Sequence, residues 1–382
     1  MAGLSPRVDG SQERRLLPRR VLVVNAGSSS LKLRVLDPSD AVVASAEVEA
    51  AGSKADAGVV REAIGGLGPV DAVGHRVVHG GTRFTAPVAL SPGVVAELEA
   101  LTALAPLHQP RSLAGIAAVS EALPGAPAVA CFDTAFHATI PDAAATYAIP
   151  REWRERWAIR RYGFHGLSHA CASRRVAELL GRAGDPALRV VTCHLGAGAS
   201  LAAVLGGRSV DTTMGFTPLD GLVMATRSGS VDPGLVVWLA GHGGLSPAEL
   251  GDGLETRSGL EGLAGTADMR EVLSRTAARD AEASLALDVY LHRLRASIAA
   301  MTATLGGLDA LVFTGGIGER SAPIRAMAAD GLGFLGITVD SSLNEDGEAD
   351  REISQRGARV RVFVVAARED LQIAREVRSV LG

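Results

Sequence analysis

Residues 21–36, VLVVNAGSSSLKLRVL, combine two runs of strand-forming residues with a turn made of glycine and serine. An apolar strand that breaks at such a turn and then resumes is typical of a β-hairpin. The backbone amides and serine hydroxyls of the turn, together with the ammonium of Lys32, can bind phosphate oxygens. Asn25, at the end of the first strand, offers a neutral oxygen that can bind a metal directly or through water. The hairpin therefore predicts a phosphate site; the alternative is an ordinary polar hairpin whose lysine extends into solvent.

Lys32 is unusual in this chain because only it and Lys54 are lysines, while the total of Lys and Arg is 38. A sequence so rich in arginine would use arginine wherever any positive charge suffices. A lysine at this place therefore indicates that a compact point charge is needed where a planar guanidinium would not fit.

The length and composition indicate a globular protein of two domains. A chain of 382 residues, 47% hydrophobic and 21% charged, is long enough to form two cores. The net charge of −4 predicts no basic face for nucleic acid. The sequence contains no run of about 18 apolar residues, so it predicts no membrane span. Residues 1–19 are expected to form a disordered extension. Cys131, Cys171 and Cys193 lack metal-binding spacing and fit a reducing cytoplasm.

The hairpin pattern occurs a second time. Residues 189–194 predict a strand, residues 195–199 a small-residue turn, and residues 200–204 a returning strand. We therefore expect an α/β fold in which one module is duplicated around a central cleft, with a domain boundary near Pro150. The other predicted strands are residues 42–48, 72–78, 127–132, 309–313 and 360–365, and the helices are 93–104, 112–123 and 368–381. A long amphipathic helix is predicted over residues 281–305, from apolar residues spaced by four and three: Leu287, Leu291, Leu294, Ile298, Met301 and Leu305.

Two motifs of the first half place charged side chains at strand ends. Arg76 lies in GHRVVHGG, residues 74–81, where an arginine beside closely approaching backbone can hold an oxyanion. Asp133 follows a buried strand, at the edge where α/β folds bind ligands, and can bind a metal or a substrate. The alternatives, which carry equal weight, are that Arg76 is a surface arginine at a strand edge and that Asp133 caps a helix. His108 follows an apolar helix, and we interpret it as structural.

Two motifs of the second half concentrate polar groups in loops. RYGFHGLSH, residues 161–169, places two His, an Arg and two Gly directly before a helix, a density that structure alone does not explain. Arg227 is followed by small residues, in a loop that presents its guanidinium. Two arginines, a lysine and a metal suit phosphoryl transfer, because its transition state spreads negative charge over the equatorial oxygens. The glycines of residues 315–318 let the backbone approach a nucleotide, and the chain has no P-loop and no dinucleotide fingerprint.

Taken in order, these segments resemble the acetate kinase family, within the sugar kinase, Hsp70 and actin superfamily. The resemblance runs from about Val21 to the C-terminal helix, and its elements are NAGSSSLK, HRVVHGG, FDTAFH, RYGFHG, MGFTPL and TGGIGE. It implies two duplicated actin-like, or ribonuclease H-like, domains that flank a central nucleotide cleft. The implied N-terminal domain comprises residues 20–149 plus 368–382, and the C-terminal domain comprises residues 150–367.

The resemblance also implies an activity, which is the reversible transfer of a phosphoryl group from ATP to acetate with Mg²⁺ or Mn²⁺, in a cytoplasmic homodimer. The products are acetyl phosphate and ADP. The implied catalytic residues are Arg76, Asp133, His165 and Arg227, and the implied acetate-binding residues are Arg76, Val78, Leu107, Phe164 and Pro218. The nucleotide and its phosphates would be bound by Ser28, Ser30, Lys32, His194, Gly196, Gly198, Gly315, Gly316 and Gly318, and the metal by Asn25 and Glu369.

Some residues depart from the family pattern. Ala197 stands where the second hairpin usually has Asn, Leu167 replaces a Thr, and Arg368 replaces a small or amide residue before Glu369. Because Ala197 and Leu167 put the rate of catalysis in question, a nucleotide-binding module that has lost turnover is one alternative. A short-chain acyl kinase that prefers propionate and a sugar kinase on the same fold are the others.

Overall fold

The computed structural model describes residues 20–382 except 28–29, 50–56, 107, 346 and 349. The predicted N-terminal extension, residues 1–19, lies outside the described residues, as do Ser28 and Leu107. No helix in the described part of the chain is long and apolar enough to cross a membrane.

The first of two sheets has six strands in the order β3-β2-β1-β4-β6-β5. These strands are β1 (Val21–Ala26), β2 (Ser30–Leu36), β3 (Val42–Glu49), β4 (Ala72–Val77), β5 (Val88–Ala89) and β6 (Ala128–Phe132). Strands β1 and β2 form the predicted antiparallel hairpin, with Val24 opposite Leu33, and β1, β4 and β6 run parallel to one another. The polar residues that follow these three parallel strands therefore meet at one edge of the sheet.

The second sheet repeats the first. Its strands are β7 (Arg189–Leu195), β8 (Ala199–Leu205), β9 (Arg208–Thr212), β10 (Ala310–Thr314), β11 (Arg351–Glu352) and β12 (Arg361–Val364). Their order is β11-β12-β10-β7-β8-β9, which is the order of the first sheet, read from its other edge, with every strand number raised by six. The antiparallel pair β7–β8 and the parallel neighbours β7, β10 and β12 also match. The predicted duplication of one α/β module is therefore confirmed.

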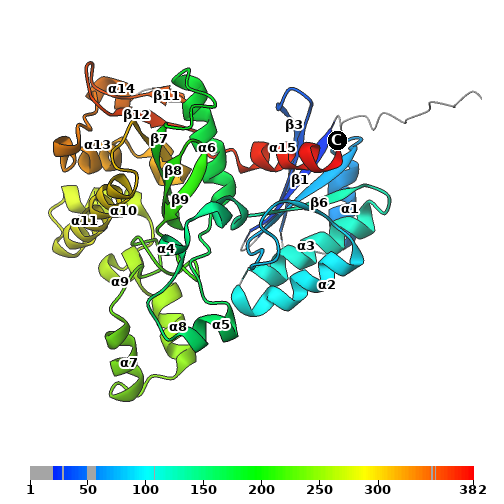
Figure 1. The fold of residues 1–382 in the computed structure, drawn as a ribbon, viewed down its shortest axis with the longest axis horizontal. Coiled ribbons are helices and arrows are strands. Elements are labelled where there is room, and N and C mark those ends of the chain that lie inside the picture. The colour runs from blue at the N-terminus through cyan, green and yellow to red at the C-terminus, as the bar shows by residue number, and fades with distance from the viewer. Residues whose placement is uncertain (1–19, 28–29, 50–56, 107, 346, 349) are drawn as a thin grey trace, which may run out of the picture.

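Alternation along β1 sends its side chains to two helical layers. Leu22 and Val24 pack beneath α1 (Ala57–Gly65) and α3 (Gln109–Ala122), and α2 (Pro92–Ala100) packs beside α3. Val21 and Val23 pack on the opposite face with the C-terminal helix α15 (Glu369–Leu381). Figure 1 shows α15, in red, lying along this sheet although it is the last element of the chain.

Helix α15 can lie this close to β4 because residue 74 is glycine. A Cβ added at Gly74 would lie 2.4 Å from Cγ2 of Ile373 and 2.7 Å from Cγ2 of Val377. Both distances are far below the 3.5–4.0 Å of ordinary carbon contacts. The bare backbone of β4 thus determines how near α15, and the residues at its start, come to the sheet.

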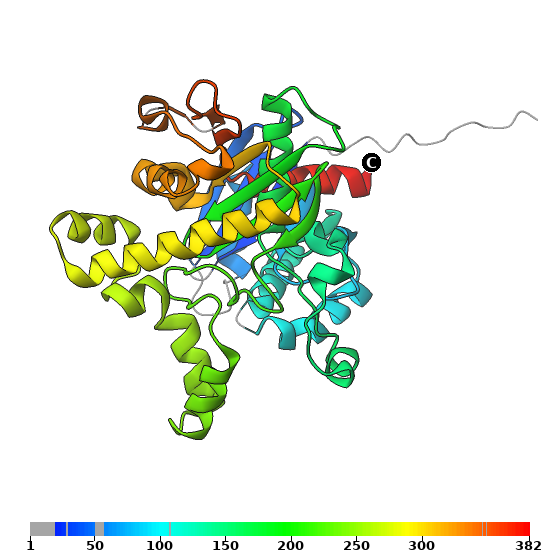
Figure 2. The same ribbon diagram turned by 60° about the vertical axis from the view of Figure 1, so that its left-hand side comes forward.

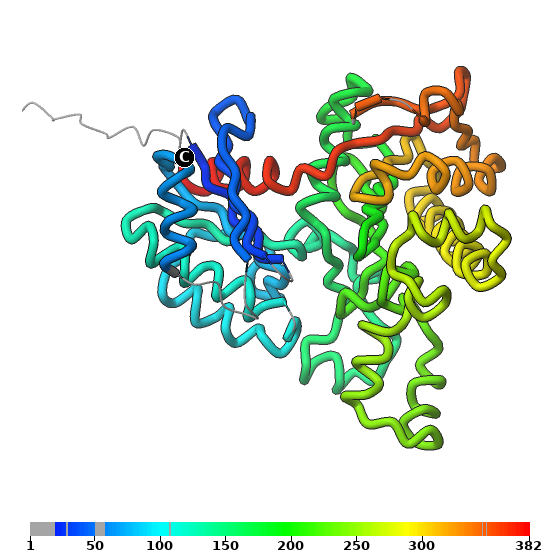
Figure 3. Tube along the Cα trace, turned by 180° about the vertical axis from the view of Figure 1, so that it is seen from behind, coloured from blue at the N-terminus to red at the C-terminus, as the bar shows by residue number. Residues whose placement is uncertain are grey.

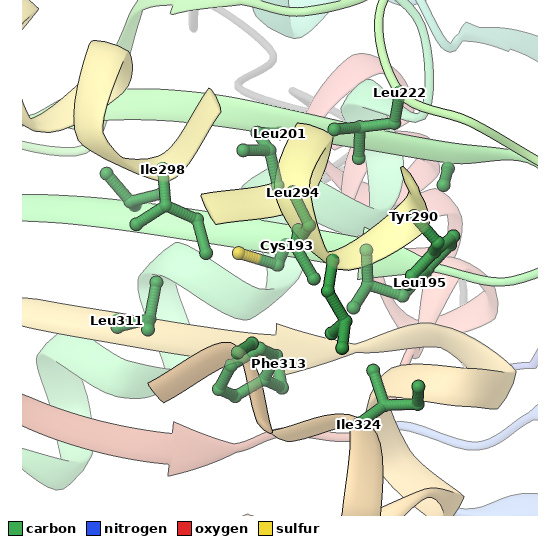
Figure 4. Packing of buried hydrophobic residues seen from close by; sticks show 14 of the residues in the cluster. Cys193, Leu195, Leu201, Leu222, Tyr290, Leu294, Ile298, Leu311, Phe313 and Ile324 are labelled. Carbon is green, nitrogen blue, oxygen red and sulfur yellow. The ribbon is translucent and has the colours of Figure 1, made fainter. Parts of the chain in front are cut away.

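The second sheet lies between α11 (Ala281–Thr304) on one face and α6 (Gly166–Leu179) on the other. The predicted stripe of α11 is confirmed, because its apolar residues belong to the core that covers β7, β8 and β10. Figure 2 shows α11, in yellow, crossing the strands, and Figure 4 shows Leu294 and Ile298 of this helix beside Cys193, Leu201 and Phe313 of the sheet.

Shorter helices complete the second half. They are α4 (Asp142–Ala145), α5 (Arg151–Trp157), α7 (Pro233–Gly241), α8 (Pro247–Thr256), α9 (Gly259–Ala264), α10 (Met269–Ala277), α12 (Gly315–Arg320), α13 (Ala322–Asp330) and α14 (Ser341–Glu345). The 3-10 helices are η1 (Leu101–Leu104), η2 (Ala135–Thr139) and η3 (Gly333–Leu335). Helices α7 and α8 extend away from the sheet, as Figure 1 shows.

The chain crosses between the two sheets twice. Figure 3 shows the second crossing, which follows β12 and leads into α15. The first crossing follows β6, and η2 then packs on β9 of the second sheet, where Thr139 Oγ1 donates to the carbonyl of Ser209 at 2.7 Å. The domain division at residue 150 stays a prediction, and this contact favours a first crossing nearer Ala135. We propose that α15 completes the N-terminal domain because it packs on the first sheet.

Candidate active site

Four side chains meet where the parallel strands of the first sheet end. Nε and Nη2 of Arg76 donate to Oδ1 and Oδ2 of Asp133 at 3.1 and 2.7 Å, and Nη1 donates to Oδ1 of Asn25 at 3.2 Å. Glu369, the first residue of α15, places Oε2 3.6 Å from Nε of Arg76. Asn25, Arg76 and Asp133 come from β1, β4 and the segment after β6, so strand order alone brings them together.

This network is largely shielded from water. The side chains of Arg76 and Asp133 are 20% and 2% exposed. Burial opposes the charge of Arg76, but the carboxylates of Asp133 and Glu369 outweigh it and keep the pKa of Arg76 above its ordinary value. Burial also raises the pKa of Asp133, against the lowering effect of Arg76. The fork of two hydrogen bonds fixes the plane of the guanidinium, which leaves Arg76 oriented for an anion.

A cavity of about 250 Å³ opens beside this network and joins the two halves of the molecule. Lys32 and Asn25 of the first hairpin line it, together with Glu369. His194 of β7 and the backbone at Gly315 line it from the second sheet. The structure therefore brings the predicted phosphate, metal and nucleotide segments to one cavity. Ser30 differs, because its hydroxyl donates to Glu47 of β3.

The turn between β7 and β8 faces two of the predicted catalytic side chains. A Cβ added at Gly198 would lie 3.3 Å from Nε2 of His165 and 3.5 Å from Nη1 of Arg227. A Cβ added at Gly196 would lie 3.9 Å from the backbone nitrogen of Gly316. The two glycine-rich segments of the second half thus lie side by side, with His165 and Arg227 next to them.

The loop before α12 needs glycine for a further reason. Gly315 has a φ of 79°, in the left-handed region, and a Cβ there would lie 2.8 Å from the carbonyl oxygen of Leu195. Glu319, one turn further along α12, accepts from the backbone amides of Gly315 and Ala367, each at 3.0 Å. Glu319 therefore ties this loop to the second crossing, a role that sequence reasoning missed although the residue follows the glycine motif.

His165 is held in an uncommon backbone conformation. Its φ is 55°, which is costly for a residue with a side chain and is often retained where function requires it. Its Nδ1 pairs with Oγ of Ser200 at 2.9 Å, and its ring stacks on His194 with centroids 4.3 Å apart. Burial, and then the neighbouring histidines and arginines, lower the pKa of His165 well below its usual range. The ring is therefore neutral at physiological pH.

Arg227 differs from Arg76 in its partners. Its Nη1 lies 3.4 Å from the carbonyl oxygen of Pro218 and 3.8 Å from Sδ of Met224, and within the described residues it forms no ion pair. Burial lowers the pKa of Arg227, and Glu255 partly offsets this effect. A partly buried guanidinium that pairs directly with no carboxylate in the described residues is available to an anionic ligand.

The charges of Arg227 and Arg76 act on His108, which we interpreted as structural. It is the N-cap residue of α3, but its side chain makes no capping hydrogen bond. Burial, and then the charges of Arg227 and Arg76, lower its pKa to about 4. His108 and His165 therefore both lie in the field of Arg76 and Arg227, which come from different halves of the chain. In the sequence, His108 is marked only by its position after an apolar helix, and that position does not indicate a neighbouring charge.

The predicted apolar residues lie near these groups. Phe164 is buried in the core of the second half, and Val78 packs against that core. The ring of His79, the residue after Val78, has its centroid 5.5 Å from that of Phe164. Pro218 contacts Arg227 through its carbonyl oxygen.

The two departures that put catalysis in question have different positions. Leu167 is buried among Val21, Cys131 and Ile373, so its side chain fills the apolar layer around α15 instead of lining the cavity. Ala197 is exposed in the β7–β8 turn beside Gly196 and Gly198. Leu167 is therefore a packing change, while Ala197 lies in the turn that faces His165 and Arg227.

The acidic groups fit one divalent metal that keeps most of its water. Among the described residues, no three His, Cys, Asp or Glu side chains form a cluster that could hold a metal. Glu369 and Asn25 nevertheless both line the cavity, where the amide nitrogen of Asn25 donates to Oε2 of Glu369 at 3.4 Å and Oδ1 of Asn25 accepts from Arg76. Mg²⁺ is commonly held by one or two protein oxygens together with water and substrate phosphates.

Known proteins share both the sequence and the fold. A model of the Acetokinase family matches residues 61–375. The acetate kinase of Streptomyces griseus is 46% identical over 400 residues, which cover 96% of this chain and 97% of that protein. The acetate kinase of Porphyromonas gingivalis superposes with a TM-score of 0.87 at 35% identity, covering 95% of this chain and all of that one (100%). A propionate kinase of Francisella tularensis superposes with a TM-score of 0.88 at 37% identity, covering 94% of this chain and 99% of that one. This chain therefore belongs to the acetokinase family.

Proposed function

We propose that this protein is an acetate kinase, which transfers the terminal phosphoryl group of ATP to acetate by a reversible in-line reaction and yields acetyl phosphate and ADP. The observation that carries the proposal is the arrangement of charged groups at one place: Arg76 is fixed by Asp133 beside Glu369, and His165 and Arg227 flank Gly198. These groups come from both halves of the chain, and Asn25, Glu369 and His194 line one cavity between the two halves.

The reaction needs no strong base, because acetate is already ionised at neutral pH. The obstacle is the repulsion between this anion and the charged phosphate. Arg76, whose plane is fixed by Asp133, would hold the carboxylate, and Arg227, which forms no ion pair with any described residue, would hold the phosphoryl group during transfer. Charges fixed in place before the reaction stabilise the transition state at no cost of reorganisation.

His165 would act as a neutral hydrogen-bond donor. Its lowered pKa keeps the ring uncharged, and its Nδ1 is engaged by Ser200, which leaves Nε2 towards Gly198 and Arg227. A neutral ring can donate a hydrogen bond to a phosphoryl oxygen. It carries no acidic proton that would be transferred to the product. This role is positional and electrostatic.

The nucleotide would lie along the second half. Lys32 would contact its phosphates from the first hairpin, and His194, Gly196, Gly198, Gly315, Gly316 and Gly318 would surround it from the second sheet. Asn25 and Glu369 would hold Mg²⁺, or Mn²⁺, which supplies charge neutralisation for the phosphates when bound. Closure of the two halves would exclude water, which would otherwise compete with acetate as the acceptor.

Acetate is the proposed substrate and propionate the close alternative. Val78, Phe164 and Pro218 would form the wall around the methyl group. One additional methylene changes binding by only about 1–3 kcal/mol in an apolar pocket. The similarity to both an acetate kinase and a propionate kinase of known structure supports this class of short carboxylic acids.

We further propose a homodimer formed through α7. None of its residues is buried, although the helix reads PGLVVWLAG, and Val237 is 72% exposed. An apolar helix that faces water indicates a surface covered by another protein, and closed symmetric dimers are the commonest assembly. Light scattering after size-exclusion chromatography tests this. Trp238→Asp should yield monomers, while Phe334→Asp, at a more exposed site on η3, should not. A dimeric Trp238→Asp variant would contradict the proposal.

The three cysteines are free, buried thiols. This state fits the reducing cytoplasm, where we propose that the enzyme acts.

The activity is tested by trapping acyl phosphate with hydroxylamine, using ATP, Mg²⁺ and acetate, propionate or butyrate. We expect turnover with acetate, weaker turnover with propionate, and a loss of about 10²–10³ in kcat for Arg227→Ala, the range seen when one such donor is removed. Arg270→Ala, which removes the same charge from a surface site, should retain activity. Folded protein that binds ATP without turnover would instead support the nucleotide-binding module.

A further inference from the structure

A second cavity, of about 220 Å³, lies on the other side of the second crossing from the catalytic cavity. Four arginines line it, and we call it the arginine pocket. Arg174 and Arg175 come from α6, Arg368 from the crossing itself, and Arg375 from α15. The pocket is therefore built between elements that pack on different sheets.

The carboxylates around the pocket are engaged by three of the arginines. Arg175 pairs with Asp350 at 2.8 Å and Glu178 at 3.3 Å.

Arg375 pairs with Asp40 at 3.2 Å, and Arg368 pairs with Asp370 at 2.9 Å. Asp40 is also bound by Arg378 at 2.5 Å, so its charge is shared between two guanidinium groups.

Arg174 is left without a carboxylate. Its Nη1 donates to the side-chain oxygen of Gln372 at 2.7 Å, and in the described part of the chain it forms no ion pair. Burial lowers the pKa of Arg174, and Arg375 acts in the same direction, while Cys171, Glu178 and Asp40 partly offset this lowering. Arg174 thus lies near carboxylates but pairs directly with none of them in the described residues, and an anion in the pocket would supply a direct partner for this partly buried guanidinium.

The crossing couples this pocket to the catalytic cavity. Successive residues of the extended segment alternate between the two spaces: Ala366 and Arg368 line the arginine pocket, while Ala367 and Glu369 line the catalytic cavity. The amide of Ala366 donates to Asp350 at 3.1 Å on one side, and that of Ala367 donates to Glu319 at 3.0 Å on the other. A ligand that displaces Arg368 therefore moves the backbone next to Glu369.

We propose that the arginine pocket is a regulatory site for a small dianion, one that carries two carboxylates or a phosphate group. Arg174 supplies the guanidinium that has no ion pair among the described residues. Arg368 and Arg375 supply further N–H donors when the anion shares them with Asp370 and Asp40. At about 30 Å³ for each water molecule, the cavity has the volume of roughly seven waters, which suits a small oxyanion. The bound anion ties α6 to α15 and changes the position of Glu369.

Binding is measured by titration calorimetry with malonate and, separately, with inorganic phosphate, in buffer without Mg²⁺ or nucleotide. Arg174→Gln should weaken binding at least tenfold, while Arg174→Lys, which keeps the charge, should retain most of it. Gln372→Glu is a second variant, because it places a carboxylate where the present acceptor lies 2.7 Å from Nη1 of Arg174, and it should likewise weaken binding at least tenfold. Arg270→Gln, whose side chain is 91% exposed, is the control variant and should bind as the wild type does. Arg227→Gln removes a guanidinium of the candidate active site, and the binding that remains in this variant is the part assigned to the arginine pocket.

The same anion should change the KM for the Mg²⁺–ATP complex in the wild type and leave it unchanged in Arg174→Gln. Loss of binding in Arg227→Gln with retention in Arg174→Gln would assign the anion to the catalytic cavity and overturn the proposal. Equal weakening in Arg270→Gln, or no binding of either anion at 10 mM or so, would also overturn it. Binding without any change in KM would overturn the regulatory role. None of the calorimetric outcomes depends on the protein being an acetate kinase.

Discussion

The contact between Gly74 and α15 is the point where packing of the fold controls the candidate site. In Gly74→Ala, the new methyl group would lie 2.4 Å from Cγ2 of Ile373 and 2.7 Å from Cγ2 of Val377. Ordinary contact requires about 3.5–4.0 Å, so α15 must move by about 1 Å. Such overpacking costs about 1–3 kcal/mol of the free energy of unfolding.

The movement should also affect catalysis, because Glu369 lies one helical turn before Ile373 and places Oε2 only 3.6 Å from Nε of Arg76. A displacement of about 1 Å at catalytic groups can reduce the rate about 10²-fold. We therefore expect a lower urea midpoint, a kcat at least about tenfold lower, and a higher Mg²⁺ requirement. The midpoint is read from tryptophan fluorescence, and kcat from the hydroxamate assay at several Mg²⁺ concentrations.

A rescue experiment separates this mechanism from general loss of stability. Ile373→Ala alone should cost about 2–5 kcal/mol by leaving a cavity. In the double variant the two changes should compensate by about 0.5–3 kcal/mol, since the removed side chain makes room for the new methyl group. Gly251→Ala, in α8 where nothing lies within 4 Å of the added Cβ, should be neutral or slightly stabilising. Additive costs in the double variant, or wild-type kcat in Gly74→Ala, would refute the reasoning.

Three further predictions concern selectivity, the nucleotide and pH. Val78→Ala should enlarge the acyl wall and raise the ratio of kcat/KM for propionate over acetate about tenfold, measured as hydroxamate, with an unchanged ratio arguing against Val78 as part of the wall. Ala197→Asn should lower the KM for ATP about threefold to tenfold, the worth of one hydrogen bond, and an unchanged KM would show that the turn does not reach the phosphates. Burial lowers the pKa of His137 to about 4, despite its hydrogen bond to the carbonyl of Phe164. The unfolded chain, with its ordinary pKa of about 6.5, therefore binds more protons between pH 6.5 and 4, and stability falls as the pH falls through this range by up to about 1.4 kcal/mol per pH unit. His137→Gln should flatten the slope of urea-derived stability against pH, and an unchanged slope would show that other groups cause it.

The elements that the sequence predicted correctly are those with local signals. Alternating apolar residues interrupted by Gly and Ser predict the β1–β2 and β7–β8 hairpins, because period-two patterning depends only on neighbours along one strand. The stripe of α11 is equally local, and all of its predicted residues lie in the core. Helices α7 and α8 were not predicted, since α7 is apolar on all sides and shows no stripe from which a buried face could be recognised.

The site residues divide in the same way. Arg76 and His165 stand in motifs rich in Gly, His and Arg, Asp133 follows a buried strand, and the sequence indicated each of them separately. Their arrangement was not local: Asp133 reaches Arg76 from 57 positions away, and Glu369 comes from the last helix. His108 gave no signal because its environment is made by two arginines from different halves of the chain.

The sequence by itself thus determined the duplicated α/β module, its hairpins, and the kinds of side chain available for binding an anion, since all of these follow from spacing and side-chain chemistry. Only the tertiary structure decided which charges are neutralised and which are free. Arg76 has acidic partners, while Arg227 and Arg174 form no ion pair in the described residues. Leu167 packs in the apolar layer, and alternate residues of one crossing segment line two cavities. These properties depend on distances between elements remote in the chain, and the physical reason is that burial and Coulomb interactions act through space.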